Sequence, residues 1–579
     1  MTEDRVFKEM DLFMDIFPAV SLRRIGQTAM MKGVSYSFPL TVGGLAMRRR
    51  KKARRRGKGL SFKQPRHSLA ERVEKVGAGK FGILAVDCAK ARFQVMLTNF
   101  YGRVLMEPVE VENTAPALDA LVTTVRRECE VHGLKDLVVG LERTGRYHRP
   151  IRNVLRPHWS VKIVHPLATK RLRVPADPGN KTDATDLLAI MRAIIAGYGT
   201  PEQELCETWA EWRSVSRARE EMVSIRAFLR VRIQERIEEL MPGYAALFAD
   251  LWRVPGAQLL AERYGSAAAL REAGQEALVE GLRAAGLRMQ CTTVARILAW
   301  AHIAPPPEAG ADALRKLLAG QLEFMHKAEA QILDYERDLA LYVADSPFVL
   351  LLGMRGINAV SASSYGAELG PIEHYANSRK ITGRAGLYPS RYQSDETDLA
   401  DGPLVAHRNA RLRGALLEIA HNLLRHNPHF KGWAALRRAK GRKAKELHVA
   451  VASRFARISY VMLTGQRAYR HPADSGRDAI LAKLTRFALD HDMGPEHTRD
   501  LLCRAVRQIP PEIRHEEAQA IEAIRPRRPR RDSRWARGAG PELLRNILPA
   551  VLDELTAGRP IKPERSPHKP KPDSGRTSH

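Results

Sequence analysis

Long apolar runs, paired cysteines and acidic residues are all scarce in this chain of 579 residues. Charged residues interrupt every apolar stretch well before the roughly 18 residues that a membrane-spanning helix needs, so we expect a soluble protein with no membrane partner. Five acids fall within the first 15 residues, and no continuous apolar core accompanies them, which is unlike a secretory signal. The five cysteines have no paired spacing, which argues against a disulfide framework or a zinc site and favours a reducing cytoplasm.

The shortage of acids leaves the chain strongly basic. Lys and Arg number 94 against 65 Asp and Glu, which gives a net charge of +29 and a pI near 10.2. This balance favours a polyanionic partner, with nucleic acid as the first interpretation and an anionic membrane surface as the second. The basic block at 48–56 predicts a disordered segment that is either a phosphate-binding arm or a solvated tail. Met31 and Met47 leave open a later start of translation.

Two short apolar runs, each typical of a buried strand, end in a carboxylate. The run 82–86 leads into Asp87, and the run 137–141 leads into Glu142. The segment order from Phe81 onward is three strands, a helix, a strand, a helix and a strand, which is the order of an RNase H-like α/β fold. In that fold the first and fourth strands are neighbours, so we expect Asp87 and Glu142 to meet at one edge of the sheet. The segments concerned are strands at 82–87, 92–98, 104–111, 137–142 and 161–164, and a helix at 115–131.

Two further carboxylates open an apolar helical segment. Thr182 is placed to cap the helix, and the spacing of Asp183 and Asp186 puts them on one helix face. Acids in a first helical turn are also ordinary partners of the helix dipole, and this pair alone leaves that alternative open. Considered together with Asp87 and Glu142 at the strand ends, this pair predicts a metal site. Carboxylates are hard oxygen donors, and no His or Cys residues at metal-ligand spacing accompany them, so the sequence favours Mg²⁺ over zinc. We expect two Mg²⁺ ions at this site.

The rest of the chain reads as mainly helical. Long amphipathic helices at 212–240 and 318–341 enclose a smaller helical insert and are typical of a core, an oligomer contact or a coiled-coil arm. The stretch 351–360 indicates a helix, a Gly-bounded turn and a new helix, and the turn either offers amides to a phosphate or binds nothing. We also expect a polar loop at 388–408 and a helical segment at 478–507. We therefore predict five regions: a basic disordered extension at 1–76, an α/β catalytic domain at 77–198, a helical coiled-coil region at 199–346, a C-terminal domain at 347–468, and a helical appendage with a polybasic disordered tail at 469–579.

Four strings occur in order over two of these regions: Asp87, the string 142–147 (ERTGRY), the string 181–186 (KTDATD) and the string 385–394 (AGLYPSRYQS). Together they resemble the DEDD transposases of bacterial insertion sequences, a family that is related to the Piv-like DNA invertases and is understood as RNA-guided bridge recombinases. The resemblance runs from about Phe81 to Thr464. In the family a Gly follows the Gln-Ser pair that Gln393 and Ser394 match, whereas this chain has Asp395.

The resemblance implies a RuvC-like RNase H-fold domain, a coiled-coil middle, and a mainly α C-terminal domain that supplies a serine nucleophile. The implied roles are Mg²⁺ binding by Asp87, Glu142, Asp183 and Asp186, and attack on DNA by Ser394, with Ser390 as the competing serine. The implied partners are double-stranded DNA, a guide RNA encoded by the element, and further copies of the chain as a dimer or tetramer. The implied location is the bacterial cytoplasm, associated with the nucleoid. Basic residues beside these motifs are the candidate nucleic-acid contacts: Lys90, Arg143, Lys181, Arg355, Arg408, Arg411 and Arg413.

Two other functions compete with a recombinase that works through a phosphoserine. A RuvC-type metal-dependent nuclease would need the four acids but not Ser394, because water would attack the phosphate. A non-catalytic nucleic-acid-binding protein, such as a decayed transposase copy, would need neither. The four intact acids speak against decay, and Asp395 speaks mildly for it.

Overall fold

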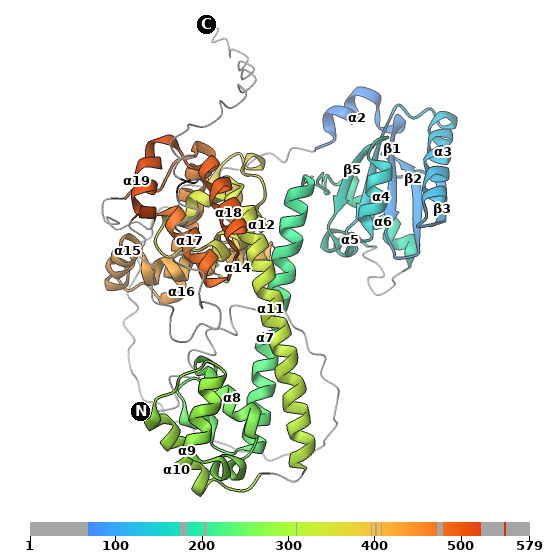
Figure 1. The fold of residues 1–579 in the computed structure, drawn as a ribbon. Helices are drawn as coiled ribbons and strands as arrows, with labels where there is room; N and C mark the ends of the chain where they lie inside the picture. Colours follow the sequence, from blue (N-terminus) through green and yellow to red (C-terminus); the bar gives the residue numbers. More distant parts are fainter. Residues whose placement is uncertain are drawn as a thin grey trace, which may run out of the picture. The chain divides into compact units, whose positions relative to one another are not determined.

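The computed structural model describes residues 68–173, 182–201, 205–307, 310–394, 397–399, 402–406, 408–471 and 479–522, together with 549 and 551. They belong to two compact units, one ending at Glu204 and the other beginning at Leu205 (Figure 1). The basic block at 48–56, Lys181 and the polybasic tail lie outside the described residues. Within the described part, no helix has the length and apolar character that crossing a membrane requires.

The first unit is built on a mixed five-stranded sheet with the order β3-β2-β1-β4-β5. The pairs β1–β2 and β2–β3 are antiparallel, and the pairs β1–β4 and β4–β5 are parallel. This arrangement is consistent with the predicted RNase H-like domain, and it confirms that the first and fourth strands are neighbours. The strands are β1 (Phe81–Asp87), β2 (Arg92–Asn99), β3 (Val104–Glu112), β4 (Asp136–Glu142) and β5 (Ser160–Val164).

Helices cover both faces of this sheet. One face packs against α3 (Ala115–Val131) and α4 (His148–Leu155), where the predicted apolar stripe of α3 is buried. The other face packs against α6 (Asp183–Ile195), whose buried side chains include Leu187, Ile190 and Ile194. Because side chains alternate along a strand, each residue of β1 and β4 belongs to one of these two faces. Shorter helices complete the unit: α2 (Ala70–Val76), η1 (Ala78–Lys80) and α5 (Pro166–Leu172).

The last residues of the extension that we expected to be disordered are instead folded onto the sheet unit. Leu69 is only 1% exposed and joins the core on the α6 face. The guanidinium of Arg72 in α2 donates hydrogen bonds of 2.6 and 2.9 Å to the Asp136 carboxylate at the start of β4. The sequence did not predict this short helix because many charged residues lie near it. The prediction of a disordered extension at 1–76 is therefore wrong for residues 68–76.

The second unit is largely helical, as predicted, and two long helices run through it. They are α7 (Glu207–Leu240) and α11 (Ala311–Ala344). The contacts Arg219–Glu336 and Arg230–Glu329 show that the two helices are antiparallel, because the residue number rises in one and falls in the other. Both helices begin several residues earlier than the sequence pattern indicated. Between them lie η2 (Ala245–Leu247), η3 (Leu251–Arg253), α8 (Pro255–Tyr264), α9 (Ala267–Ala284) and α10 (Cys291–Ile303), which share one apolar core with them.

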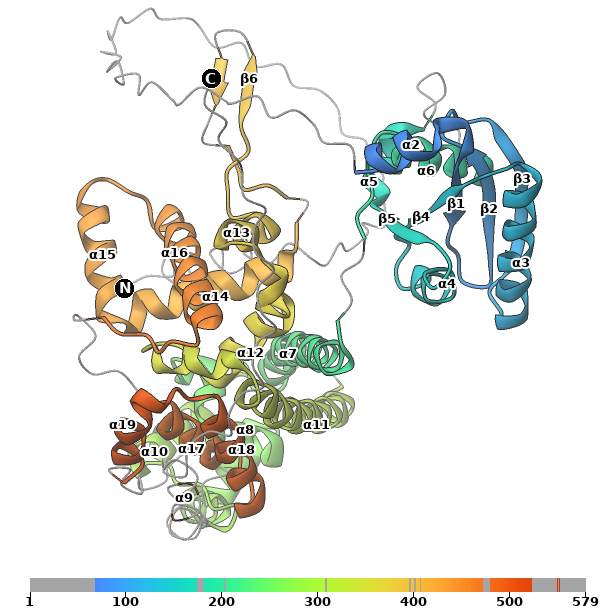
Figure 2. The same ribbon diagram turned by 90° about the horizontal axis from the view of Figure 1, so that it is seen from above.

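The second core of this unit gathers the other end of α7 and α11 with the C-terminal helices (Figure 2). The helical segment predicted at 478–507 contains two helices, because the first ends at Asp490 and the second begins at Pro495, after its N-cap Gly494. The predicted helix before the Gly-bounded turn is a 3₁₀ helix. The elements are η4 (Pro347–Gly353), α12 (Ala359–Leu369), η5 (Ile372–His374), α13 (Ser378–Ala385), α14 (Ala410–His426), α15 (Pro428–Ala439), α16 (Ala444–Gly465), α17 (Ile480–Asp490), α18 (Pro495–Gln508) and α19 (Pro511–Glu522).

The segment 388–408, expected to be a polar loop, contains a two-stranded antiparallel ladder. Its strands are β6 (Tyr392–Ser394) and β7 (Thr397–Leu399), with Ser394 paired to Thr397. The ladder continues toward α13 through backbone hydrogen bonds between Ser390 and Pro403 and between Tyr388 and Val405. Strands of three residues without an apolar face give little signal in a sequence, which explains why they were not predicted.

Candidate active site

Asp87 and Glu142 stand at the ends of neighbouring parallel strands. Val86 of β1 is the partner of Leu141 in β4, so the next residue on each strand is a carboxylate. Adjacent strands lie about 4.8 Å apart. Ile83 and Ala85 pack on the α6 face, and strict alternation puts Asp87 on the same face. Val138 belongs to that face too, which carries Glu142 with it. The two carboxylates therefore share one edge and one face of the sheet.

The electrostatics of Cys88 reflect the same proximity. Its thiol is buried. Burial raises the pKa of Cys88 most strongly, and the negative charges of Asp87 and Glu142 raise it further. Because both carboxylates raise the pKa of this thiol, negative charge is concentrated at the ends of β1 and β4. Such a concentration suits a bound cation.

Helix α6 brings a third carboxylate to this face. Thr182 caps the helix as predicted, with its Oγ1 accepting a hydrogen bond from the amide of Thr185 at 3.2 Å. Asp186 lies one turn before Ile190 on the same side of the helix, and it is only 3% exposed. Ile190 packs against β4 at Gly140, where an added Cβ would lie 3.1 Å from the Ile190 side chain. Asp183, at the first position of α6, is exposed.

Asp186 already has a cationic partner that the sequence did not reveal. The Nε atom of Arg173 donates a hydrogen bond of 2.5 Å to Asp186 Oδ1, and the Arg173 side chain is largely buried. Arg173 follows α5 and is separated from Asp186 by residues outside the described set. No local pattern marks this arginine, since its role depends on how α5 and α6 pack. A buried, charge-assisted pair of this kind holds α6 and its carboxylate in place.

The donor set has the right chemistry for Mg²⁺, which coordinates oxygen ligands and prefers carboxylates. Asp87 and Glu142 lie at one sheet edge, and Asp186 lies on the helix that covers that face. Across the described residues, no three His, Cys, Asp or Glu side chains are grouped closely enough to hold a metal ion. The donor chemistry of Asp87, Glu142 and Asp186 fits a divalent cation, and Arg173 occupies Asp186 Oδ1.

The predicted serine lies in the second unit, at the end of β6. Ser394 is the last residue of that strand, and the two residues before its partner Thr397 are Asp395 and Glu396, which lie outside the described residues. The competing Ser390 is part of the ladder itself, because its amide donates to Pro403 O at 2.8 Å and its carbonyl accepts from Gly402 at 3.1 Å. A Cβ added to Gly402 would lie 2.5 Å from Ser390 Oγ, so this hydroxyl is packed against the backbone of Gly402.

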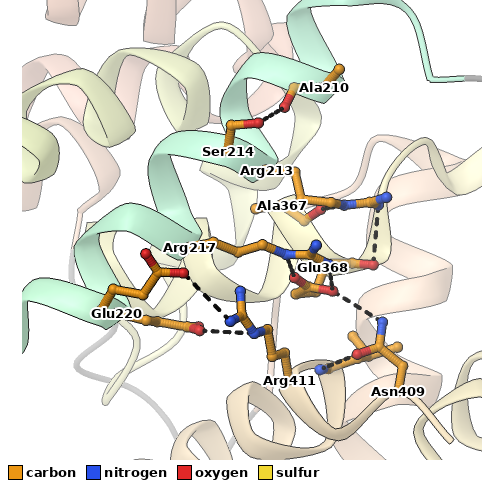
Figure 3. Close-up of polar contacts among 11 residues, drawn as sticks. Ala210, Arg213, Ser214, Arg217, Glu220, Ala367, Glu368, Asn409 and Arg411 are labelled. Carbon is orange, nitrogen blue, oxygen red and sulfur yellow. Dashed lines mark hydrogen bonds and ion pairs between the residues drawn. The ribbon is translucent and has the colours of Figure 1, made fainter. Parts of the chain in front are cut away.

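Three of the predicted nucleic-acid contacts, Arg408, Arg411 and Arg413, interact with protein groups of the helical unit. Arg408 donates to the Tyr388 hydroxyl at 3.0 and 3.2 Å. Arg413 donates to the carbonyls of Ala385 and Val405, and burial lowers its pKa. Figure 3 shows Arg411 reaching toward acids of α7, with separations of 3.6 Å to Glu220 and 3.9 Å to Glu221.

The remaining predicted contacts are placed differently. Lys90 follows β1 and Arg143 follows β4, and both side chains are exposed near the carboxylate edge. Arg355 is half-buried in the Gly-bounded turn. The helix after that turn, α12, is almost wholly buried, and Asn358 accepts a hydrogen bond of 2.8 Å from the amide of Ser361 at its start. An amide already engaged in this way is not offered to a phosphate.

A cavity of about 630 Å³ opens elsewhere in the helical unit, between α7 and α11. Its lining includes the stacked rings of Trp209 and Trp212 and the acids Asp338 and Asp345. Its lining contains none of the predicted catalytic residues. The carboxylate edge of the sheet, rather than this cavity, is therefore the candidate active site.

Comparison with known protein families agrees with the ordered strings of the sequence. Residues 84–242 match the model of the DEDD transposases, and residues 349–434 match the model described as the transposase IS116/IS110/IS902 family. The first match spans Asp87, Glu142 and α6, and the second spans Ser394. No curated protein matches the chain.

Proposed function

The chain belongs to the IS110 family of DEDD transposases, and from that premise we propose that it cuts and rejoins DNA through a covalent phosphoserine. Transposition implies DNA binding, and the DEDD family implies metal-dependent catalysis. The observation that carries the proposal is the register of β1 and β4, which brings Asp87 and Glu142 to one edge beneath α6.

In the proposed site Asp87, Glu142, Asp183 and Asp186 hold Mg²⁺, most simply as two ions. When bound, the metal neutralises charge that develops on the phosphodiester and orients attack and departure. Asp87 and Glu142 are held by the sheet, whereas Asp186 contributes after exchanging its ion pair with Arg173. The carboxylates at the ends of β1 and β4 thus form the fixed part of the proposed site, and the Asp186 side chain, which must exchange its ion pair, forms the adjustable part.

The nucleophile in this proposal is Ser394 Oγ. It forms a bond to phosphorus as the bond from phosphorus to a sugar oxygen breaks, the serine loses its proton, and the departing oxygen gains one. Because one ester bond replaces another, a second DNA end can reverse the step and produce strand exchange without hydrolysis. Ser390 is the weaker candidate, since its hydroxyl packs on Gly402 and its backbone completes the ladder.

The assembly around this chemistry is also proposed from the family. Ser394 belongs to the helical unit and the acids to the sheet unit, and the proposed chemistry requires the serine to come from the same chain or from another copy. We assign 77–198 to the RuvC-like catalytic domain, 199–346 to the coiled-coil region and 347–468 to the serine-bearing domain. A guide RNA encoded by the element selects the DNA by base pairing, and the protein acts as a dimer or tetramer.

The test is to express the protein with its flanking element DNA and look on a denaturing gel for DNA attached covalently to the chain. We expect an adduct with the wild type and with Ser390→Ala, and none with Ser394→Ala or Asp87→Ala. Nicked DNA without an adduct would replace the proposal with a hydrolytic nuclease. An adduct that survives in Ser394→Ala would contradict the assignment of the nucleophile.

A further inference from the structure

A basic surface lies where α15 and α16 meet. Residues 435–446 are exposed without interruption, and we call this segment the basic turn. It holds six cationic side chains and a single acid, Glu446. The segment begins just beyond the part of the chain that matches the family, which ends at residue 434. Its cationic residues are Arg437, Arg438, Lys440, Arg442, Lys443 and Lys445.

The backbone of the basic turn has a defined shape. Gly441 ends α15 with a φ of +81°, a conformation that favours glycine. The amide of Gly441 donates to Arg438 O at 2.9 Å, and the amide of Arg442 donates to Arg437 O at 3.2 Å. The helices on either side are anchored, since Phe430 of α15 and Leu447 of α16 are buried. Figure 2 shows these two helices as a hairpin that ends in the turn.

Trp433 fixes the base of the basic turn. The guanidinium of Arg437 lies 5.1 Å from the centre of the Trp433 ring, and that of Arg454 in α16 lies 5.7 Å from it. Both guanidinium groups lie within cation–π distance of this indole. The ring therefore orients Arg437, and within the described part of the chain Arg437 forms no ion pair with an acid.

Only part of the charge in the basic turn matches the dipoles of its two helices. Arg437 and Arg438 suit the C-terminal end of α15, where the helix dipole favours cations. Lys443, the N-cap of α16, and Lys445 in its first turn lie where the dipole disfavours cations. The acid of the segment, Glu446, is engaged by Arg442 at 3.1 Å. Among the described residues, Arg438, Lys440 and Lys443 form no ion pair with an acid, and such a cluster of like charges indicates an anionic ligand.

We propose that the basic turn binds the phosphate backbone of double-stranded DNA. The inference rests on the DNA-recombining function proposed above and adds a contact surface outside the carboxylate edge. Duplex DNA carries one negative charge per about 1.7 Å of its axis, so a row of flexible cations on a narrow turn can meet several phosphates at once. The segment is rich in Lys and Arg, which are side chains that donate hydrogen bonds to phosphate oxygens.

The test compares two triple variants that remove the same charges. The first carries Arg438→Gln, Lys440→Gln and Lys443→Gln in the basic turn. The control carries Arg271→Gln, Arg283→Gln and Lys316→Gln, which are exposed cations of α9 and α11 in the same unit. Affinity for a nonspecific DNA duplex is measured at several salt concentrations by fluorescence anisotropy with the full chain. The same titrations are repeated with an RNA duplex of equal length.

Each phosphate contact contributes about 0.9 to the slope of log affinity against log salt concentration, so three lost contacts reduce its magnitude by about 2.7. We expect this reduction for DNA in the basic-turn variant and a slope near that of the wild type in the control. Equal slopes in the two triple variants would overturn the proposal, because only net charge would then matter. A change confined to the RNA duplex would overturn it in favour of an RNA-binding surface.

The outcome is separable from that of the proposed function. The titrations contain no Mg²⁺ and require no strand cleavage. If the wild type forms the covalent adduct but the basic-turn variant keeps its salt slope, this inference fails and the proposed function stands. If the slope falls as expected and no adduct is ever formed, the surface stands and the recombinase mechanism fails.

Discussion

The two units hold their charged groups in place by different means. In the sheet unit, Asp87 and Glu142 are adjacent because the backbone ladder of β1 and β4 is in register. In the helical unit, Glu368 of α12 is held by side chains from two other helices, Arg217 of α7 and Asn409 at the start of α14 (Figure 3). Backbone register tolerates the loss of a side chain, whereas a buried network of side chains does not. The sheet unit should therefore lose chemistry when its acids are replaced, and the helical unit should lose stability.

The largest stability effect is expected from Glu368→Gln. Glu368 is only 1% exposed and accepts hydrogen bonds of 2.7 and 3.1 Å from Arg217. Removing its charge leaves Arg217 without its carboxylate partner, and because Arg217 keeps some contact with solvent we expect a loss of about 2 to 3 kcal/mol. Urea unfolding followed by helical circular dichroism measures it.

The matched control for that variant is Glu235→Gln on α7. Glu235 pairs with Arg232 at 2.8 Å, and both side chains are half exposed. An exposed pair of this kind contributes less than about 0.5 kcal/mol. If Glu368→Gln and Glu235→Gln lower the free energy of unfolding by the same amount, the contrast between a buried network and a surface pair in this unit is wrong.

A steric change in the sheet unit is expected to cost somewhat less. At Gly140 an added Cβ would lie 2.8 Å from Ile194 and 3.1 Å from Ile190, so Gly140→Ala pushes α6 away from β4. We expect a loss of about 1 to 3 kcal/mol together with weaker DNA cleavage, because Asp186 moves with the helix.

Gly79→Ala serves as the comparison in the same unit. Its Cβ would meet nothing nearer than Tyr101 at 3.8 Å, an ordinary contact distance. Thermal unfolding and adduct formation are measured for both variants. Normal cleavage in Gly140→Ala would show that the position of α6 does not matter to the chemistry.

The stability that Glu368 contributes to the helical unit should depend on pH. Burial raises the pKa of Glu368, but the hydrogen bonds and charge of Arg217, with Asn409 and Arg213, outweigh it and lower the pKa below its ordinary 4.5. The stabilisation by this carboxylate is thus present above pH 4.5 and is lost as the pH falls through the lowered value. The gap in unfolding free energy between the wild type and Glu368→Gln should narrow as the pH falls below 4.5. A gap that stays constant down to about pH 3 would contradict this.

The smallest effect is expected from Arg411→Gln. Its guanidinium lies 3.6 and 3.9 Å from two acids of α7, and its side chain is 40% exposed. Long, exposed ion pairs contribute little, so the unfolding free energy should change by less than about 0.5 kcal/mol. A larger change would place Arg411 in the buried network with Glu368. Because Arg411 was also a candidate nucleic-acid contact, its affinity for duplex DNA is measured on the same sample.

Local pattern predicted much of the sheet unit, and the reason is physical. The apolar runs before Asp87 and Glu142 are short, continuous and bounded by turns, which is how buried parallel strands appear in a sequence. Thr182 was predicted as a helix cap from its neighbours alone, and the cap is formed. Helix α15 was missed although Asn427 and Pro428 mark its start, because the basic residues that follow obscured its apolar face.

What could not be predicted depends on contacts between distant parts of the chain. Arg173 acquires its role only when α5 and α6 pack, and Arg413 acquires its role from the carbonyls of Ala385 and Val405. Positive charge alone could not tell Arg413, which is used inside the fold, from Lys440, which is exposed. Sequence reasoning therefore identifies candidate charges, and tertiary packing decides which of them remain available to a ligand.

The most direct test of the central claim is a titration of the full chain with Mn²⁺, a spectroscopic substitute for Mg²⁺, followed by electron paramagnetic resonance without nucleic acid. Asp87→Asn and Glu142→Gln should each weaken binding at least about tenfold. The control Glu107→Gln, an exposed acid of β3, should bind like the wild type. Undiminished Mn²⁺ binding by Asp87→Asn and Glu142→Gln would contradict the claim that the ends of β1 and β4 form the metal site.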